Sequence, residues 1–162
     1  MNKTITDKQT TMSVDISRYV GVWYQLAHYP SWFQHNDCYN TTADYKLIDN
    51  YTILITNTTI SNGEIRQVKG QGKILGDGML RVSFPSTPNI EGEDRTTPNY
   101  IIDNVWSNTA GEYRFATVTD CNKSQFYLLS REAHPCLEEY NQVINYVTNN
   151  FNRDKIVLTP HY

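Results

Sequence analysis

The chain has 162 residues, a length that suits one domain with a single hydrophobic core. Its 14 Lys and Arg residues against 17 Asp and Glu residues give a formal net charge of −3, so the sequence offers no basic field that would hold nucleic acid or an anionic membrane. No stretch approaches the roughly 20 consecutive apolar residues that a membrane-spanning helix needs.

The first 14 residues are polar and lack the apolar middle of a signal peptide, and they contain no cysteine that could carry a lipid. We therefore expect a flexible N-terminal tail over residues 1–14 and one folded domain over residues 15–162. If the chain is complete as printed, the protein is expected to be cytoplasmic. If a leader has been removed, it is expected to be secreted or periplasmic.

A glycine between a short helical turn and an aromatic strand opens the expected domain. Residues 16–25 read Ile-Ser-Arg-Tyr-Val-Gly-Val-Trp-Tyr-Gln. Gly21 lets the chain bend sharply because it has no Cβ. A strand is predicted at about 22–29, in which Trp23 enters the core as one large anchor.

Residues 40–84 alternate apolar and polar side chains, which is typical of strands with one buried face. Asn62-Gly63 is the strongest hairpin signal in the chain. Gly70 and Gly72 lie inside a strand, where glycines often mark a bend at a barrel corner. Four strands are predicted here, at about 40–47, 51–60, 64–75 and 79–84. Their predicted inner face consists of Ala43, Tyr45, Leu47, Ile53, Ile55, Asn57, Leu80, Val82 and Phe84.

The polar, proline-rich stretch 85–98 is predicted to be a loop, and three further strands follow at about 99–106, 112–119 and 125–131. For the first of these strands the sequence does not decide which side chains point inward: they are either Tyr100 and Ile102 or Ile101 and Asp103. Eight strands in sequential hairpins, with no crossover helices, predict an all-β fold: an antiparallel up-and-down barrel.

One helix is predicted after the barrel, beginning at Pro135. Its apolar residues recur every three or four positions, which places them on one face that can press against the outside of the barrel. These residues are Leu137, Tyr140, Ile144, Val147 and Phe151. The segment Ile156-Val157-Leu158 is predicted to add a short ninth strand beside the first one.

A barrel of eight strands is about wide enough to hold one small ligand. The predicted inner face is apolar with a few polar groups, which is the usual composition of a small-molecule site. To these candidate ligand-binding residues we add Ala27, Tyr29 and Trp32. The same side chains could instead pack against one another and fill the barrel, and the periodicity leaves both interpretations open.

Two short motifs resemble those of the lipocalin family, particularly its bacterial, plant temperature-induced and apolipoprotein D-like branch. Gly21 and Trp23, with the preceding helical turn, match the first motif, and Ser130-Arg131 matches the third. The second motif, Thr-Asp-Tyr, is not clean here, since the chain reads Asp103-Asn104-Val105-Trp106. The resemblance covers about residues 15–159 and implies the lipocalin calyx, in which the Arg lies across the Trp at the closed end. Gly21, Trp23 and Arg131 are therefore expected to be structural.

The resemblance implies binding, storage or transport of a small hydrophobic ligand, such as a fatty acid or lysophospholipid, inside the barrel. Tyr45 and Asn57 fall where apolipoprotein D-like relatives line the pocket. An alternative is an interaction protein whose open-end loops, with Trp32 and Phe33 in one of them, meet a membrane or a protein partner, so that the barrel is only a scaffold. We expect a monomer or a weak homodimer, with peripheral membrane contact as one option.

The three cysteines, Cys38, Cys121 and Cys136, are an odd number, so at least one has no partner within the chain. Cys38 and Cys121 lie at positions where lipocalins often have bridged cysteines, although the usual partners are missing. The resemblance therefore allows a Cys38–Cys121 disulfide if both reach the same rim. Free thiols are the default for a cytosolic protein.

Signals for catalysis are poor. The chain contains no Gly-x-Ser-x-Gly, phosphate loop or Cys-x-x-Cys, and its four histidines lack metal-binding spacing. A haem site would need one inward histidine, and simple alternation places His28 on the opposite side of its strand from Trp23. We therefore expect no cofactor, no metal and no enzyme activity, with an isomerase of lipid-like substrates as the enzymatic alternative.

Overall fold

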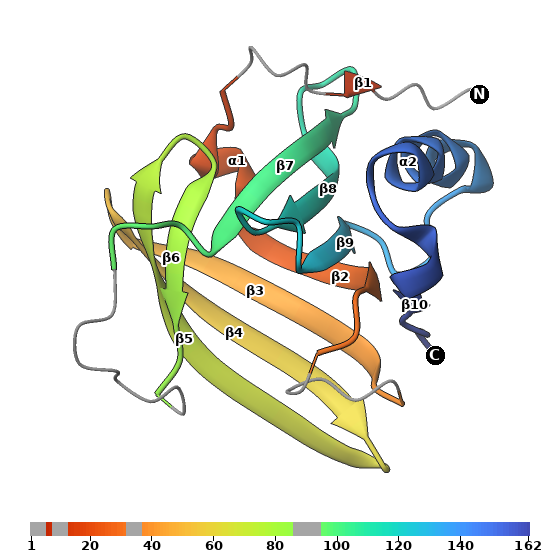
Figure 1. Cartoon of the computed structure of the whole chain (residues 1–162), viewed down its shortest axis with the longest axis horizontal. Helices are drawn as coiled ribbons and strands as arrows, with labels where there is room; N and C mark the ends of the chain where they lie inside the picture. The colour runs from red at the N-terminus through yellow and green to blue at the C-terminus, as the bar shows by residue number, and fades with distance from the viewer. Residues whose placement is uncertain (1–5, 8–12, 32–36, 86–94) are drawn as a thin grey trace.

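The computed structural model describes residues 6–7, 13–31, 37–85 and 95–162, and describes residues 6–7 by their backbone alone. Eight antiparallel strands follow one another around a closed barrel in the order β7-β6-β5-β4-β3-β2-β9-β8, and β8 pairs back to β7 (Figure 1). The predicted up-and-down barrel is therefore confirmed. Its strands are β2 Gly21–His28, β3 Tyr39–Asp49, β4 Thr52–Ser61, β5 Glu64–Gly76, β6 Met79–Ser83, β7 Tyr100–Ser107, β8 Tyr113–Thr119 and β9 Phe126–Ser130.

Two short strands are added outside this ring. β10, Val157–Leu158, pairs antiparallel with β2, as the sequence predicted for a ninth strand. β1, Thr6–Asp7, pairs with β7 although it belongs to the expected N-terminal tail. Val14, at the end of that tail, is buried in the core, and its backbone N–H donates to the Asp77 carboxylate at 2.7 Å. Parts of the expected tail thus lie against the barrel.

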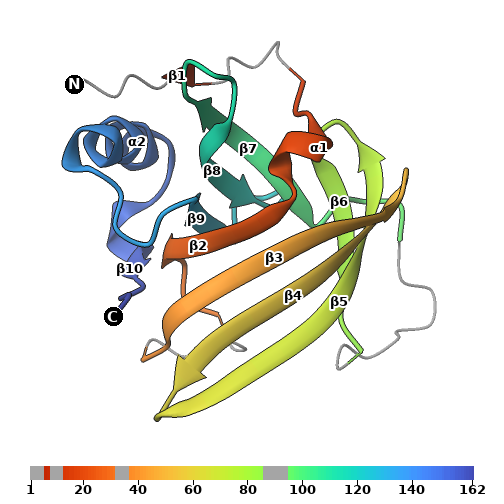
Figure 2. The same cartoon turned by 180° about the vertical axis from the view of Figure 1, so that it is seen from behind.

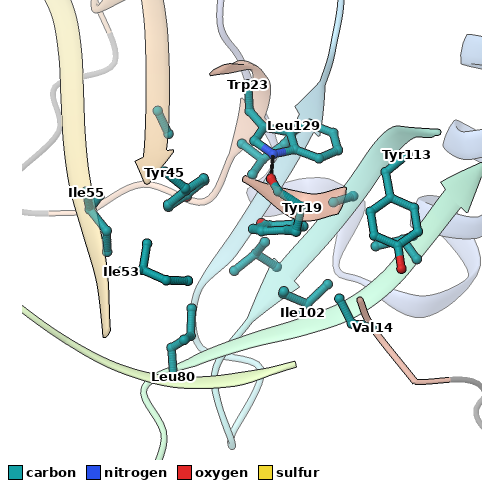
Figure 3. Packing of buried hydrophobic residues seen from close by; sticks show 14 residues of the cluster. Val14, Tyr19, Trp23, Tyr45, Ile53, Ile55, Leu80, Ile102, Tyr113 and Leu129 are labelled. Carbon is teal, nitrogen blue, oxygen red and sulfur yellow. Dashed lines mark hydrogen bonds between the residues drawn. The ribbon is translucent and has the colours of Figure 1, made fainter. Parts of the chain in front are cut away.

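The core inside the barrel is closed at one end by α1, Ile16–Tyr19, and by the start of β2. We call this the closed end, and the opposite end, where β2 finishes and β3 begins, the open end. Tyr19 and Trp23 lie side by side, with 5.2 Å between their ring centroids, and the Trp23 indole N–H donates to the Tyr19 carbonyl at 2.7 Å (Figure 3). Trp23 is thus the anchor that the sequence predicted.

A second apolar cluster lies outside the barrel, under α2, Leu137–Asn150. The helix covers the outer faces of β2, β7, β8 and β9, and both views show it on the side of the barrel away from β4 and β5 (Figures 1 and 2). Val143 and Val147 are buried at its centre, whereas Leu137 is 71% exposed. The expectation that Leu137 faces the barrel was therefore wrong. Leu137 is the first residue of the helix, where the packed face has not yet turned toward the sheet.

A short 3-10 helix, Arg153–Lys155, connects α2 to β10. The last residues then run along β2 and β3. The Thr159 backbone N–H donates to the Leu26 carbonyl, and the Asn40 backbone N–H donates to the Pro160 carbonyl, both at 2.9 Å. The C-terminal segment therefore extends the barrel wall where β2 and β3 diverge.

Candidate functional site

The closed end is held by Arg131, which follows β9. Its guanidinium carbon lies 3.8 Å from the centroid of the Trp23 ring, which confirms the predicted stacking. Its Nη1 and Nη2 donate to the carbonyls of Val22, Arg18 and Val20 at 2.8–2.9 Å. Arg131 therefore ties β9 to α1 and β2 and seals the barrel below Trp23.

Gly21 allows the Arg131 guanidinium to lie close to the backbone at the start of β2. Its φ of +104° is a backbone conformation that L side chains rarely adopt, and a Cβ there would lie 3.3 Å from Arg131 Nη1. The predicted roles of Gly21, Trp23 and Arg131 as structural residues at the closed end agree with these contacts.

The barrel wall places most of the predicted ligand-binding residues on its inner face. Ala43, Tyr45, Ile53, Ile55 and Leu80 are buried members of the inner cluster, and Figure 3 labels the last four. Leu47, Val82 and Phe84 are only partly buried and pack against it. Asn57 is paired with Ala43 across the strands and so shares its face. The structure brings these residues together, and their contact with a ligand stays a prediction.

Ala27 and Tyr29 do not belong to this lining. Both lie in the outer cluster, where Tyr29 packs on Phe126 and Phe151 under α2. The reason is an irregularity in β2 between Gln25 and Ala27, which shifts the alternation by one residue. The expectation that Ala27 and Tyr29 line the interior was therefore wrong.

The same shift turns His28 inward. His28 is paired with Tyr127 of β9, and Tyr127 packs on the inner cluster, so the two side chains share the inner face. The prediction that His28 faces away from Trp23 was wrong for this reason. His28 is buried, its Nδ1 lies 2.8 Å from the Tyr29 carbonyl, and burial lowers the pKa of its imidazole. The imidazole is accordingly neutral near pH 7, with Nδ1–H donating to that carbonyl.

The structure also shows which side chains of the strand predicted at 99–106 point into the barrel. Tyr100 and Ile102 point inward, because Ile102 is buried in the inner cluster and the Tyr100 hydroxyl donates to the Tyr45 hydroxyl at 2.8 Å. Asp103 faces α2 instead and accepts hydrogen bonds from Tyr146 and Thr117. The side-chain oxygen of Asn108 organises the following turn by accepting from the N–H groups of Ala110 and Glu112.

Three tyrosines from different elements form a hydrogen-bonded row inside the barrel. The Tyr19 and Tyr100 hydroxyls are bonded to each other, and Tyr100 is bonded to Tyr45. Burial is the main cause that raises the pKa of Tyr45 to about 12 and the pKa values of Tyr19 and Tyr100 well above their ordinary range. All three are uncharged at neutral pH. The sequence analysis included Tyr45 among the ligand-binding residues and left Tyr100 as one of two possible inward facings, but it missed the interior position of Tyr19.

The inner wall contains no fully buried charge among the residues that the structure describes. Among all described residues Glu139 is the one buried acid, and no Lys or Arg is buried. Glu139 belongs to α2, outside the barrel, and its carboxylate lies 3.6 Å from Arg114 Nε. In the described ranges, no group of three His, Cys, Asp or Glu side chains is placed to hold a metal ion, and no helix is long and apolar enough to cross a membrane.

The cysteines are free thiols: Cys38 is buried, Cys121 is exposed and Cys136 is intermediate. The allowed Cys38–Cys121 disulfide is therefore absent. Cys121 lies in the turn after β8, and its thiol donates to the Pro98 carbonyl at 3.3 Å. Trp32 and Phe33, on which the loop-based alternative depends, lie outside the described residues.

A hollow of about 490 Å³ lies outside the closed end and is bordered by Arg18, Arg114 and Arg131. Each of these cations already has a partner. Arg18 lies 3.4 Å from Asp15, Arg114 is paired with Glu132 and Glu139, and Arg131 is bonded to backbone carbonyls. This hollow is therefore bordered by residues that close the barrel, and its cations are engaged in doing so.

The lipocalin-like domain model matches residues 14–160 of the chain. The chain belongs to the lipocalin family. This lipocalin is 30% identical over 145 residues to a lipocalin of Acanthamoeba polyphaga mimivirus, a match that covers 88% of this chain and 82% of the relative. It is 26% identical over 159 residues to temperature-induced lipocalin-1 of Arabidopsis thaliana, covering 95% of this chain and 83% of the relative.

Solved structures confirm the fold of this lipocalin. The cockroach allergen Per a 4 is 17% identical with a TM-score of 0.66, covering 96% of this chain and 94% of the allergen. Apocrustacyanin C1 is 18% identical with a TM-score of 0.64, covering 91% and 80% of the two chains. Lipocalins are generally binding and transport proteins for small hydrophobic molecules rather than enzymes, since their eight-stranded barrel is wide enough to hold one such ligand.

Proposed function

We propose that this lipocalin binds and carries a ligand with an acyl chain, such as a fatty acid or a lysophospholipid, inside its barrel. The observation that carries the proposal is the incomplete burial of apolar side chains on the inner wall. Val82 and Phe84 pack against the inner cluster and still remain partly exposed. Partly exposed apolar side chains in a concave wall are what a hydrophobic ligand covers.

Two glycines of β5 lie on the same inner face. Gly70 and Gly72 are paired with Ile55 and Ile53, and they share the inner face with those residues. The Phe84 ring packs directly over Gly70, where a Cβ would lie 2.6 Å from Phe84 Cδ1, so side chains of β6 form part of the inner surface there. A chain of a dozen carbons buried there would gain about 0.8 kcal/mol per CH₂, and roughly micromolar affinity would remain after the cost of association.

The proposed ligand-binding residues are those that the structure places on the inner wall. They are Ala43, Tyr45, Leu47, Ile53, Ile55, Asn57, Leu80, Val82 and Phe84. Two experiments test the proposal. In the first, the purified protein is extracted with organic solvent and any bound lipid is identified by mass spectrometry. A co-purified single-chain lipid at a ratio near one per protein would support it.

The second experiment uses cis-parinaric acid, a fatty acid whose fluorescence rises when it is buried. Val82→Trp would fill space inside the barrel, and Ser83→Trp places a side chain of the same size at the exposed neighbouring position. We expect Val82→Trp to weaken binding on the order of tenfold, or about 1.4 kcal/mol, and Ser83→Trp to bind like the unmodified protein. Circular dichroism checks that both variants are folded. Equal binding by Val82→Trp and the unmodified protein would contradict an internal site.

The alternative, an interaction protein that contacts a membrane or a partner through its open-end loops, rests on residues 31–37 and 85–98. Most of these lie outside the described residues, so no observation favours the alternative. Trp32→Ser separates the two ideas, because it should abolish vesicle or partner binding with cis-parinaric acid binding unchanged if the loops carry the function.

A further inference from the structure

The inner face of β4 and β5 changes from apolar to cationic toward the open end. Residues that are paired directly across two strands share one face of the sheet. From the closed end outward, the pairs are Ile53 with Gly72, Ile55 with Gly70, Asn57 with Val68 and Thr59 with Arg66. The first two pairs are buried, Val68 is 49% exposed, and Arg66 is exposed. The change from apolar wall to charge thus takes place between Gly72 and Arg66, roughly 20 Å of strand.

The last of these pairs lies at the mouth of the barrel. The β4–β5 hairpin, which carries Arg66, projects past the end of β2 (Figures 1 and 2). Thr41 of β3 belongs to the same row, because its Oγ1 lies 2.6 Å from Thr59 Oγ1. The Thr59 hydroxyl donates to the Tyr39 carbonyl at 3.4 Å, so Thr41 donates to Thr59. Both hydroxyl protons are used within the wall, and the N–H groups of Arg66 are the donors that this row has left.

Arg66 has no partner of its own in the described part of the chain, since neither an ion pair nor a hydrogen bond joins it to another described residue. Glu64, nearer the tip of the hairpin, shares its face without pairing with it. Lys69 and Lys73 alternate with the inner residues of β5 and face outward, as does Lys46 of β3. Among the described residues of the barrel strands, Arg66 is the one cation on the inner face.

A cation at the mouth of an apolar interior suits a ligand that has a hydrocarbon chain and an anionic head. The inner wall covers the chain, and the head stays at the level of Arg66, where both charges keep contact with water. The desolvation that makes a fully buried ion pair costly is therefore small. The planar guanidinium can donate two parallel hydrogen bonds to a carboxylate or a phosphate, whereas a neutral head gains no charge-assisted bond.

We propose that Arg66 binds the anionic head of the ligand, a carboxylate or a phosphate ester, while the acyl chain extends along β4 and β5 toward the closed end. The ligand enters tail first and keeps its charge at the open end. Arg66 is then a specificity residue that favours single-chain anionic amphiphiles over neutral ones of the same chain length. This inference rests on the proposed function and deepens it, because it names the head group and the side chain that recognises it.

The test measures displacement of Nile red, an uncharged fluorescent probe, by dodecanoate, dodecyl phosphate and dodecanol, which share one hydrocarbon chain and differ in the head. Each is measured on the unmodified protein, Arg66→Gln and Lys69→Gln. Both variants lose one positive charge from an exposed position of β5, but Lys69 faces outward, so its variant is the matched control. We expect Arg66→Gln to weaken binding of the anions on the order of fivefold with dodecanol unchanged, and Lys69→Gln to change none of the three.

The two anions distinguish the possible heads. A loss for dodecanoate alone identifies a carboxylate site, a loss for dodecyl phosphate alone identifies a phosphate ester site, and an equal loss shows that either head is accepted. Each of these results supports the inference. Arg66→Lys keeps the charge without the planar donors, so it should lose less affinity for the anions than Arg66→Gln does.

Unchanged dodecanol binding shows that the barrel is folded in each variant. The inference is overturned if Arg66→Gln binds both anions as tightly as Lys69→Gln does, or if it loses dodecanol to the same extent as the anions. If neither Nile red nor dodecanol binds the unmodified protein, the proposed function itself fails, and the inference fails with it.

Discussion

The guanidinium of Arg131 lies 3.8 Å from the centroid of the Trp23 ring, although Trp23 belongs to the first barrel strand in the sequence and Arg131 follows the last. The same guanidinium donates to three carbonyls of the segment from Arg18 to Val22. One side chain therefore joins the aromatic anchor, α1 and the last barrel strand. This contact sets the closed end on which the rest of the interior is built.

Removing this side chain should destabilise the fold. Arg131→Leu loses the stacking and leaves the carbonyls without their donors, so we expect a loss of about 2–4 kcal/mol in the free energy of unfolding, measured by urea denaturation. Arg131→Lys keeps a charge without the planar donors and should lose a smaller amount. Arg153→Leu, at an exposed position, should change the free energy by less than about 0.5 kcal/mol. If Arg131→Leu also changes the free energy of unfolding by less than about 0.5 kcal/mol, the Arg131 contacts at the closed end do not stabilise the fold.

We expect the ion pair of Arg114 with Glu139 to contribute far more to stability than its ion pair with Glu132. Its guanidinium lies 3.6 Å from the Glu139 carboxylate, which is fully buried, and 3.1 Å from that of Glu132, whose side chain is 45% exposed. Arg114→Leu leaves Glu139 buried without this cation and should cost about 3–5 kcal/mol by urea denaturation. Glu132→Gln should cost about 0–1 kcal/mol.

The double variant Arg114→Leu/Glu139→Leu is the control for this pair. It removes both charges, so we expect it to recover much of the stability that Arg114→Leu loses. If the double variant is as unstable as Arg114→Leu alone, the loss comes from packing rather than from a buried carboxylate that has lost its cation.

Alkaline pH should remove a contribution of Tyr45 to stability. Its folded-state pKa of about 12 lies above the ordinary value of 10.0, so the folded state holds its proton where the unfolded state has lost it. This contribution is complete below pH 10.0 and is lost as the pH rises toward about 12, at roughly 1.4 kcal/mol per pH unit. Tyr45→Phe lacks this group, so its unfolding free energy should fall less than that of the unmodified protein. If the difference in unfolding free energy between the two proteins stays constant from about pH 8 to about pH 11, ionisation of Tyr45 does not contribute.

Two glycines on the inner face of β5 should respond differently to a methyl group. A Cβ at Gly70 would lie 2.5 Å from the backbone oxygen of Ser83 and 2.6 Å from Phe84 Cδ1, whereas a Cβ at Gly72 would have Ile55 Cδ1 at 3.4 Å as its nearest neighbour. We therefore expect Gly70→Ala to cost about 1–3 kcal/mol, because the backbone of β6 must move. Gly72→Ala should stay within about 0.5 kcal/mol. Thermal unfolding of the two variants compares them directly, and equal effects would contradict the predicted close approach of β6 to Gly70.

Much of the architecture could be predicted from local patterns. Alternation in Ala43, Tyr45 and Leu47 places these residues on one face of β3, because successive side chains of a strand point to opposite sides. Asn62-Gly63 forms the β4–β5 hairpin, and the stacking of Arg131 on Trp23 followed from the motif resemblance. These features depend on residues that are close in sequence or on a recognisable pair, so the chain itself was sufficient to predict them.

Other features were decided by the tertiary structure. The irregularity between Gln25 and Ala27 moves Ala27 and Tyr29 to the outer cluster and turns His28 inward, and nothing in the local alternation marks it. Tyr100 faces Tyr45 because β7 closes the barrel against β8, which selects one of two facings that its own sequence left open. Strand periodicity fixes which side chains share a face, but the face that becomes the interior is chosen only when distant strands pair.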